Sequence, residues 1–386
     1  MAHQNEAHQY QSTPEATVEN NLAELRKKRG FSAAGLAEKA GVNRQTIYAM
    51  EAGQYVPNTA VALRLAAALE ATVEELFHLA PSGIEARHRQ EVEMVANRQK
   101  LQPGQPVQWC RVGKRVVGVP ATPMPSYLSP AHGFVVHAPT RGRPKATVQL
   151  TGSAGAVQQL LMAGCDPAMS VLARHLKEAD VELVLAPVNS SQALTLLRDG
   201  LVHSAGTHLR EESTEEDNLP AIRALFPKKA VAVITFAEWE EGLVTATGNP
   251  KHIKSIEDLA RPGIRLINRE KGAGSRRLLD MLLNQAGIPR ARVSGYEQIC
   301  FGHLAAAWQV ATSQADCCVA TCSAARVFGL GFIPLRRERY DLVVRKEHLE
   351  ITGMTRLLDT LSRGAFRREL EVQSGYDTRQ TGQRIV

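Results

Sequence analysis

Short polar, glycine-containing segments lie where strand-like apolar runs give way to helical patterns in the second half of the sequence. Residues 164–168 read Gly-Cys-Asp-Pro-Ala, residues 189–193 read Asn-Ser-Ser-Gln-Ala, and residues 272–277 read Gly-Ala-Gly-Ser-Arg-Arg. At such turns, free backbone N–H groups, serine hydroxyls and the positive end of the helix dipole are available together. Because these groups bind negative charge, the sequence predicts a site for an oxyanion or a carboxylate between the turns.

Three of the six cysteines stand close together, at positions 317, 318 and 322. Their spacing leaves two interpretations open, a metal or redox sensor and a set of buried apolar side chains, although it is not a standard zinc pattern without a fourth ligand. The sequence shows neither a nucleophile paired with a base nor a phosphate-binding Gly-X-X-X-X-Gly-Lys-Ser/Thr loop. We therefore expect a protein that is not an enzyme and has no metal site or cofactor.

A different chemistry is indicated near the N-terminus, over residues 32–53. Two helical patterns meet at Gly41, where a tight turn needs a residue without a Cβ atom. Leu36, Ile47 and Met50 fall on the shared inner face. Polar side chains project outward from the start of the following helix, where base edges of DNA are read: Arg44, Gln45, Thr46 and Tyr48.

This segment resembles the helix-turn-helix of the Cro and phage-repressor (xenobiotic-response-element) type, and the resemblance covers about Asn21 to Phe77. It implies that Arg26 on the first helix pairs with Glu51 late in the recognition helix. The sequence departs from the family at Ala33, where a glutamine usually holds a DNA phosphate. We expect a nearby cation, Lys27, Lys28 or Arg29, to replace that contact. With the start of the recognition helix, the predicted DNA-binding residues are Lys27, Lys28, Arg29, Asn43, Arg44, Gln45, Thr46 and Tyr48.

The second half of the chain resembles the bacterial molybdate-binding-like domain, which is similar to type II periplasmic binding proteins and is found fused to helix-turn-helix domains. Segments 164–168, 205–209, 268–276 and 338–342 carry the resemblance, which covers about Val148 to Val386. It implies two α/β lobes joined by crossing strands, with a ligand in the cleft. By position, the ligand-binding candidates are Cys165, Ser190, Ser191, Thr207, His208, Asn268, Arg269, Gly274, Ser275, Arg276, Tyr296 and His303, with Gly206 beside them.

The donor types among these candidates favour some anions over others. Molybdate and tungstate are fully deprotonated at neutral pH, so a selective site needs donors and no acceptor. Arg269 and Arg276 would equally suit a larger organic anion, such as a pterin phosphate, or would form salt bridges outside the cleft. Four hydroxyls suit molybdate or tungstate: Ser190, Ser191, Thr207 and Ser275.

The elements that must position these residues divide the chain into zones. Residues 1–18 are polar and without periodicity, which predicts a disordered tail. Residues 19–80 show short helices punctuated by glycines and by caps at Ser32, Asn43 and Thr72, which predicts an all-α DNA-binding domain. For 81–145 we expect a basic linker with short strands. For 146–386 the alternation of strands and helices predicts an α/β domain, with lobe one at about 146–235 and 345–386 and lobe two at about 245–340.

Composition sets the outer limits. The 386 residues carry a formal charge of +7, and the segment 81–146 alone has ten Lys or Arg against three acids, which suits a polyanion as well as a solvated linker. No stretch is long and apolar enough for a membrane helix or a signal peptide, so we expect a cytoplasmic protein with reduced thiols.

These observations together predict a one-component transcriptional regulator. It would bind double-stranded operator DNA through residues 21–77 and sense a small anion, molybdate or tungstate first, in the C-terminal cleft. A homodimer is expected because a single helix-turn-helix offers little contact area. Two alternatives stay open: a regulator that senses an organic anion such as a molybdopterin-related compound, and one whose silent cleft serves only dimerisation.

Overall fold

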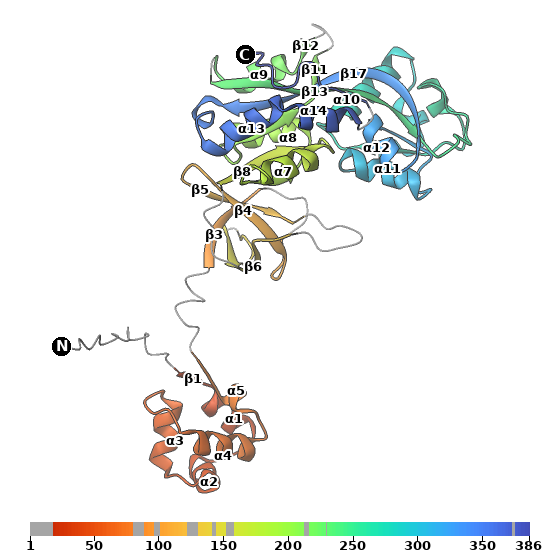
Figure 1. Ribbon diagram of the computed structural model, residues 1–386. Coiled ribbons are helices and arrows are strands. Elements are labelled where there is room, and N and C mark those ends of the chain that lie inside the picture. The colour runs from red at the N-terminus through yellow and green to blue at the C-terminus, as the bar shows by residue number, and fades with distance from the viewer. Residues whose placement is uncertain are drawn as a thin grey trace, which may run out of the picture. The chain divides into compact units, whose positions relative to one another are not determined.

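The computed structural model describes residues 18–79, 89–95, 101–121, 130–140, 144–151, 158–211, 216–228, 230–372 and 375–386. The chain divides into two compact units, residues 1–89 and 90–386, and each is described by itself (Figure 1). Within the described residues, no helix is long and apolar enough to cross a membrane.

Short capped helices make up the N-terminal unit, as predicted. Their bounds are α1 (Leu22–Lys28), α2 (Ala33–Ala40), α3 (Arg44–Glu51), α4 (Thr59–Leu69) and α5 (Val73–Leu76). The predicted caps are confirmed, because the side chains of Ser32, Asn43 and Thr72 each accept a hydrogen bond from the backbone N–H three residues on. Gly41 ends α2 in the left-handed conformation, with φ of 67°.

The core of this unit is formed by the inner faces of α1 to α5. Leu36, Ile47 and Met50 are fully buried and share one cluster with Leu22 and Leu65. A short antiparallel pair, β1 (Val18–Asn20) and β2 (Phe77–Leu79), joins the two ends of the unit. Val18, which we expected in a disordered tail, instead begins strand β1. The remainder of that predicted tail, residues 1–17, lies outside the described residues.

A closed barrel occupies most of the segment in which the sequence predicted a basic linker. Its strands are β3 (Arg89–Met94), β4 (Pro106–Val112), β5 (Arg115–Pro120), β6 (Gly133–His137) and β7 (Ala146–Leu150). β3 pairs in parallel with β5, a non-local pairing that no local sequence pattern reveals. β7, which the sequence analysis assigned to lobe one, pairs with β6 in this barrel.

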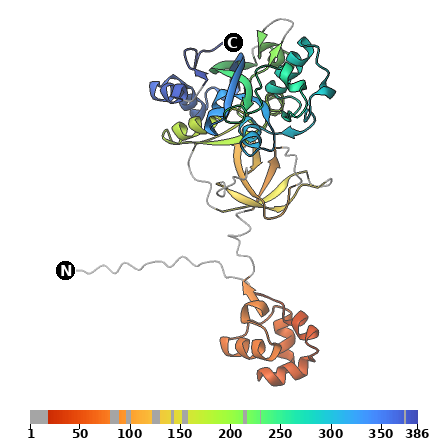
Figure 2. The same cartoon turned by 90° about the vertical axis from the view of Figure 1, so that its right-hand side faces the viewer.

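The barrel belongs to the same compact unit as the α/β part. Val117 and Val119 of β5 pack in one buried cluster with Leu161 and Val184 of the α/β sheet. Figure 2 shows the barrel strands, in orange and yellow, beside that sheet. The described lysines and arginines of the barrel segment are exposed, so its positive charge lies on the surface.

The α/β part is built on one continuous mixed sheet with the strand order β15-β14-β16-β13-β17-β10-β8-β9, and β18 pairs with β13. A small antiparallel pair, β11 (Arg210–Glu211) and β12 (Glu216–Asp217), lies apart from it. The strands of the sheet are β8 (Gln158–Gly164), β9 (Val181–Pro187), β10 (Ser204–Thr207), β13 (Val231–Thr245), β14 (Leu266–Arg269), β15 (Ile299–Cys300), β16 (Cys317–Thr321), β17 (Gly331–Arg345) and β18 (Tyr376–Asp377).

Two long antiparallel strands, β13 and β17, join the two halves of this sheet (Figure 1). β10, β8 and β9 lie on one side of the pair, and β16, β14 and β15 on the other. This arrangement confirms the predicted two-lobed α/β fold. The sequence had indicated only 230–234 and 340–344 as strands here, because the other parts of β13 and β17 carry charged residues.

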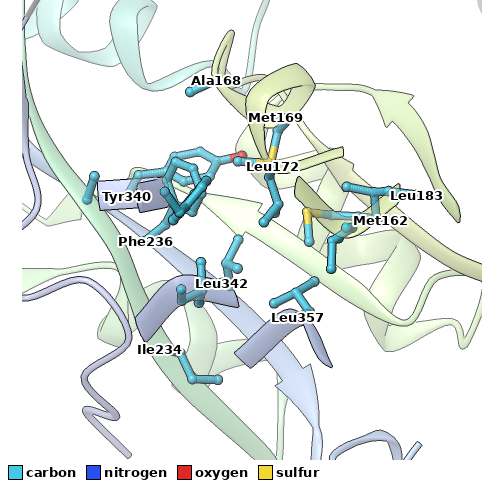
Figure 3. Packing of buried hydrophobic residues seen from close by; sticks show 14 of the residues in the cluster. Met162, Ala168, Met169, Leu172, Leu183, Ile234, Phe236, Tyr340, Leu342 and Leu357 are labelled. Atoms are coloured by element: carbon cyan, nitrogen blue, oxygen red, sulfur yellow. The ribbon is translucent and has the colours of Figure 1, made fainter. Parts of the chain in front are cut away.

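Helices follow the strands and cover both faces of the sheet. They are α7 (Met169–Lys177), α8 (Ser190–Arg198), α9 (Leu219–Leu225), α10 (Gly274–Gln285), α11 (His303–Ala311), α12 (Cys322–Val327), α13 (Thr352–Ser362) and α14 (Gly364–Val372), with 3-10 turns at Glu257–Ala260, Arg290–Arg292 and Lys346–His348. Figure 3 shows one of the cores, where Phe236 and Tyr340 pack with Met162, Leu172 and Leu357. These buried contacts fix β8, the strand that leads to Cys165.

Candidate functional site

A thiol and two imidazoles from three separate segments converge inside the α/β part. Cys165 follows β8, His208 follows β10, and His303 begins α11. The Cys165 Sγ lies 3.6 Å from His208 Nε2 and 3.8 Å from His303 Nε2. Both histidines are buried, with 2% and 1% of their surface exposed. Three predicted candidates that are far apart in sequence are thus brought together.

Two carboxylates from the long crossing strands complete this cluster. The His208 Nδ1–H group donates to Glu338 Oε2 of β17 at 2.7 Å and lies 3.6 Å from Glu241 Oε2 of β13. Arg336 donates to the other Glu338 oxygen at 2.6 Å. Sequence reasoning missed both glutamates, because Trp-Glu-Glu at 239–241 and Arg-Arg-Glu-Arg at 336–339 look like solvent-facing segments.

Buried hydrogen-bond donors lie among the same segments. Arg269 ends β14 with 1% of its surface exposed, and its Nε donates to Glu270 at 3.0 Å. Its two terminal nitrogens have no hydrogen-bond partner among the described residues, and the same holds there for the hydroxyls of Thr207 and Ser275. The Ser190 hydroxyl accepts from the His208 backbone N–H at 3.1 Å. Buried polar groups are rarely left unpaired, so these atoms indicate a ligand site.

The pKa values of Glu338 and Glu241 are shifted in opposite directions. Burial by itself raises the pKa of Glu338, but the hydrogen bond and charge of His208 outweigh it and lower that pKa to about 2. Burial and the neighbouring Glu338 charge raise the pKa of Glu241 to about 8. Burial lowers the pKa of His208, yet the Cys165 thiol and the two carboxylates raise it well above its ordinary value. One carboxyl group is therefore ionised and the other protonated at neutral pH.

Arg269 influences the protonation of His303. Burial, followed by the charge of Arg269, holds the pKa of His303 well below its ordinary value. Burial opposes the charge of Arg269, but Glu270 and Cys165 compensate and raise its pKa. A neutral imidazole therefore faces a permanent cation inside the protein.

The loops that carry the anion-binding turns are joined to one another. The Asn189 side chain donates to the Lys271 carbonyl at 3.2 Å, and the Ser191 hydroxyl donates to the Gly272 carbonyl at 3.1 Å. A Cβ atom on Gly274 would lie 2.4 Å from the His208 carbonyl oxygen, so only glycine allows this approach. The predicted turns before α8 and α10 therefore meet, and Ser191 serves this junction.

Other candidates serve the packing of lobe two. The Asn268 amide donates to the Tyr296 carbonyl at 3.0 Å and accepts from the Arg269 N–H at 2.8 Å. Arg276 donates to the Arg269 carbonyl at 3.0 Å and stacks on the Tyr296 ring. The Tyr296 hydroxyl donates to Asp280. These side chains are engaged within the lobe, so the structure does not bring Asn268, Arg276 and Tyr296 into the cluster of unpaired donors.

The cysteine cluster left open by the sequence lies on β16 and the start of α12. Cys317 packs in one buried core and Cys318 in another, because successive strand residues face opposite sides of a sheet. Burial raises the pKa of Cys317 to about 12 and that of Cys318 well above its ordinary value. Both side chains are therefore protonated apolar fillers that do not converge on one metal ion.

The predicted DNA-reading face lies on α3. Asn43, Arg44, Gln45 and Tyr48 are exposed, and Thr46 is half-buried. Arg44 donates to the Tyr48 hydroxyl at 3.1 Å and lies over its ring, while Asn43 caps the helix. Lys27 and Lys28 are exposed at the end of α1.

The ion pair implied by the helix-turn-helix resemblance is present. Arg26 binds both oxygens of Glu51, with distances of 2.6 and 3.0 Å. Arg29 is engaged elsewhere, because it lies 3.3 Å from Glu70 and donates to the Glu70 carbonyl. Lys27 and Lys28 are thus the more available of the three predicted phosphate-binding cations.

Comparison with known proteins supports this division into two functional parts. Residues 20–79 match a family described as a helix-turn-helix domain, and residues 172–362 match a PBP superfamily domain. The HTH-type transcriptional regulator YgzD of Bacillus subtilis (strain 168) is 40% identical over 62 residues, which cover 16% of this chain and 94% of YgzD. The chain is therefore a helix-turn-helix regulator that also carries a domain of the PBP superfamily.

A second Bacillus protein is similar to this chain over a longer stretch of sequence. YvgK of Bacillus subtilis (strain 168) is 34% identical over 228 residues, which cover 59% of this chain and 73% of YvgK. Among solved structures, the sulfate-binding protein SubI from Mycobacterium tuberculosis H37Rv is 18% identical, covers 57% of this chain and 86% of its own, and has a TM-score of 0.42. The chain therefore belongs to the same family as YvgK, with a PBP superfamily domain that here accompanies an N-terminal helix-turn-helix domain.

Proposed function

We propose that the protein is a one-component transcriptional regulator that senses a small anion, with molybdate and tungstate as the first candidates. The main support for an anionic ligand is the Arg269 guanidinium. It is buried, and both of its terminal nitrogens lack a partner among the described side chains and backbone groups. A buried cation with free parallel donors matches two oxygens of an anion. The free hydroxyls of Thr207 and Ser275 add neutral donors of the kind that molybdate accepts.

The buried acid at this site is compatible with an anion. Glu241 has a pKa raised to about 8 by burial and by Glu338, so it is protonated at neutral pH and offers a donor. The proposed anion site depends on the Arg269 guanidinium and the two hydroxyls, and not on this acid.

Titration calorimetry of the full chain with sodium molybdate, sodium tungstate and sodium sulfate tests the ligand. Ser275→Ala removes a hydroxyl without a protein partner in the described structure, so the fold should tolerate it while the affinity for molybdate falls about 10- to 100-fold. Ser204→Ala is the matched control, since that hydroxyl is also buried and unpaired among the described residues but lies at the far end of β10. Equal affinities in the two variants would contradict the assignment, and heat from an organic anion alone would favour the pterin alternative.

For DNA, we propose that α3 reads base edges in the major groove. Genomic fragments retained by the full chain would supply the operator. Arg44→Ala and Gln45→Ala should each weaken binding to such a fragment at least about fivefold, whereas Arg292→Ala, an exposed arginine of the C-terminal unit, should leave it unchanged. Equal effects of all three substitutions would contradict the assignment of α3.

Sensing requires that the anion bind two conformations with different affinity. Fluorescence anisotropy of the selected fragment, measured with and without molybdate, should show a shift in the DNA dissociation constant. Unchanged DNA affinity at a saturated anion site would support the silent-cleft alternative.

The proposal includes a cytoplasmic location, where operator DNA is accessible, and a homodimer. A dimer places two recognition helices on successive half-sites and so multiplies the affinity of each. Light scattering coupled to size-exclusion chromatography should give twice the chain mass of 42.1 kDa. A monomer that binds the selected fragment with full affinity would contradict this part.

A further inference from the structure

The thiol and imidazoles at Cys165, His208 and His303 have the geometry of metal ligands. One ligand atom from each of these residues lies within 4.8 Å of the other two. Zinc bonds of about 2.3 Å to sulfur and about 2.0 Å to nitrogen, at a tetrahedral angle, place the two ligand atoms about 3.5 Å apart. The observed distances from Cys165 Sγ to the two Nε2 atoms are 3.6 and 3.8 Å. An ion therefore needs only a small adjustment of these side chains.

A hydrogen-bonded cluster explains this arrangement less well. A thiol is a weak donor and its sulfur a weak acceptor, so hydrogen bonds to Cys165 would hold the two imidazoles at this point only weakly. The distances of 3.6 and 3.8 Å are similar, so neither histidine is singled out as the acceptor. A cation between the three atoms satisfies all of them at once.

The outer nitrogens of both histidines face carboxylates, as in most protein sites where histidine binds a metal. His208 Nδ1 lies 2.7 Å from Glu338 Oε2, so Nε2 is the ring nitrogen that faces Cys165 and would bind the ion. His303 Nδ1 lies 3.9 Å from Glu241 Oε1, beyond hydrogen-bond distance. In the described part of the chain, His303 Nδ1 has no hydrogen-bond partner, so Glu241 is the carboxyl group placed to accept from it.

Carboxyl groups lie beside the ligand atoms. Glu270 and Glu338 are each paired with an arginine, Arg269 and Arg336. Glu241 instead lies 3.6 Å from His208 Nδ1 and 3.9 Å from His303 Nδ1. The outer side of both imidazoles is therefore lined by carboxyl oxygens, which suits bound cations.

We propose that Cys165, His208 and His303 bind a borderline-soft divalent ion of the zinc class, with the fourth coordination position left to an exogenous ligand. One thiolate and two imidazoles favour Zn²⁺ or Co²⁺ over Mg²⁺ and Ca²⁺, which prefer oxygen. Three protein ligands with an open position are typical of zinc sites that accept another molecule. The inference goes beyond the proposed function, because it holds whether or not an anion or DNA binds.

Cobalt alone tests the site. Full-length protein, freed of metal with a chelator and exchanged into chelator-free buffer, is titrated with CoCl₂ while the visible and near-ultraviolet absorption is recorded. We expect one equivalent to bind, with intense tetrahedral d–d bands and a thiolate-to-cobalt charge-transfer band, and ZnCl₂ to abolish both. Absence of stoichiometric cobalt and zinc binding in the wild-type chain would overturn the proposal.

Variants identify the ligands. Cys165→Ser should abolish the charge-transfer band, and His303→Gln should weaken Zn²⁺ binding by at least about 100-fold. Glu338→Gln should keep the band and weaken binding about 10- to 100-fold, since it acts only through His208. Cys322→Ser, at a free thiol outside the proposed ligand set, is the control and should behave as wild type. A band that persists in Cys165→Ser and disappears in Cys322→Ser would place the metal elsewhere, and urea unfolding checks that each variant is folded.

Discussion

Protonation of a buried histidine should make the stability of the α/β part fall as the solution is acidified. His203 lies just before β10 with 3% of its surface exposed. Its Nδ1 accepts a hydrogen bond from the Leu161 N–H at 3.0 Å, and the His348 ring lies 5.1 Å away. Burial and the charge of His348 lower the pKa of His203 to about 4. The folded protein therefore holds this imidazole in its neutral form.

The magnitude follows from the difference between the folded and unfolded pKa values. The unfolded chain binds a proton at a pKa of about 6.5, and each pKa unit corresponds to about 1.4 kcal/mol. Between about pH 6.5 and pH 4 the unfolded state carries a proton that the folded state lacks, so the free energy of unfolding falls as the pH falls. The loss attributable to His203 is about 3 kcal/mol over this range.

Urea unfolding followed by tryptophan fluorescence measures the effect, because Trp109, Trp239 and Trp308 all lie in the C-terminal unit. His203→Asn keeps an acceptor for the Leu161 N–H but does not titrate. Other groups change with pH in both proteins, so the informative quantity is the difference between wild type and variant at pH 7 and at pH 4.5.

The difference should shift by about 2.5 kcal/mol in favour of His203→Asn at the lower pH, which lies about two pH units below the unfolded pKa. His252→Asn, at an exposed histidine, is the matched control and should follow the wild type at both pH values. If His203→Asn also follows the wild type, the argument from burial and the Leu161 hydrogen bond is refuted.

Three further substitutions test the local structure. Glu51→Ala leaves its half-buried arginine partner without a counter-charge and should destabilise the N-terminal unit by about 1 to 2 kcal/mol, measured by hydrogen exchange of α1 and α3. Glu38→Ala on the exposed face should change the same quantity by less than about 0.5 kcal/mol. Asn43→Ala removes the cap of α3 and should cost about 1 kcal/mol in the same measurement, with weaker operator binding. Gly274→Ala places a Cβ 2.4 Å from the His208 carbonyl, so molybdate affinity in calorimetry should fall at least about 10-fold; an unchanged affinity would show that this approach is not needed for binding.

The N-terminal unit could be predicted closely because its signals are local. Ser32, Asn43 and Thr72 are caps that act on the next turn of chain, and Gly41 is required by a single backbone conformation. The barrel depends instead on pairings between distant segments, such as β3 with β5. Its short strands and prolines are typical of a linker, because the closing of the barrel by distant strands produces no local sequence pattern.

The candidate site shows the same limit at the level of single residues. Cys165 and Ser275 were found because they stand in strand-to-helix turns, where the local pattern indicates exposed N–H groups, and His208 was found through the resemblance carried by residues 205–209. Glu241 and Glu338 were not found, because they lie inside long strands whose charged residues resemble a loop. A signal was available: strand prediction on either side of each glutamate would place a charge in a buried strand, which is unusual without a function.

The anion and the metal ion that we propose share one site, and their relation makes a final prediction. Arg269 influences both Cys165 and His303 electrostatically, so an anion at the open metal position would lie within the field of its free donors. If the metal supplies the main attraction, molybdate binding should disappear when a chelator removes Zn²⁺ and return when Zn²⁺ is restored. If Arg269 and the hydroxyls suffice, the chelator should leave the affinity unchanged and Ser275→Ala should still weaken it. Calorimetry of Cys165→Ser separates these cases, because this variant loses the metal but keeps every proposed donor to the anion.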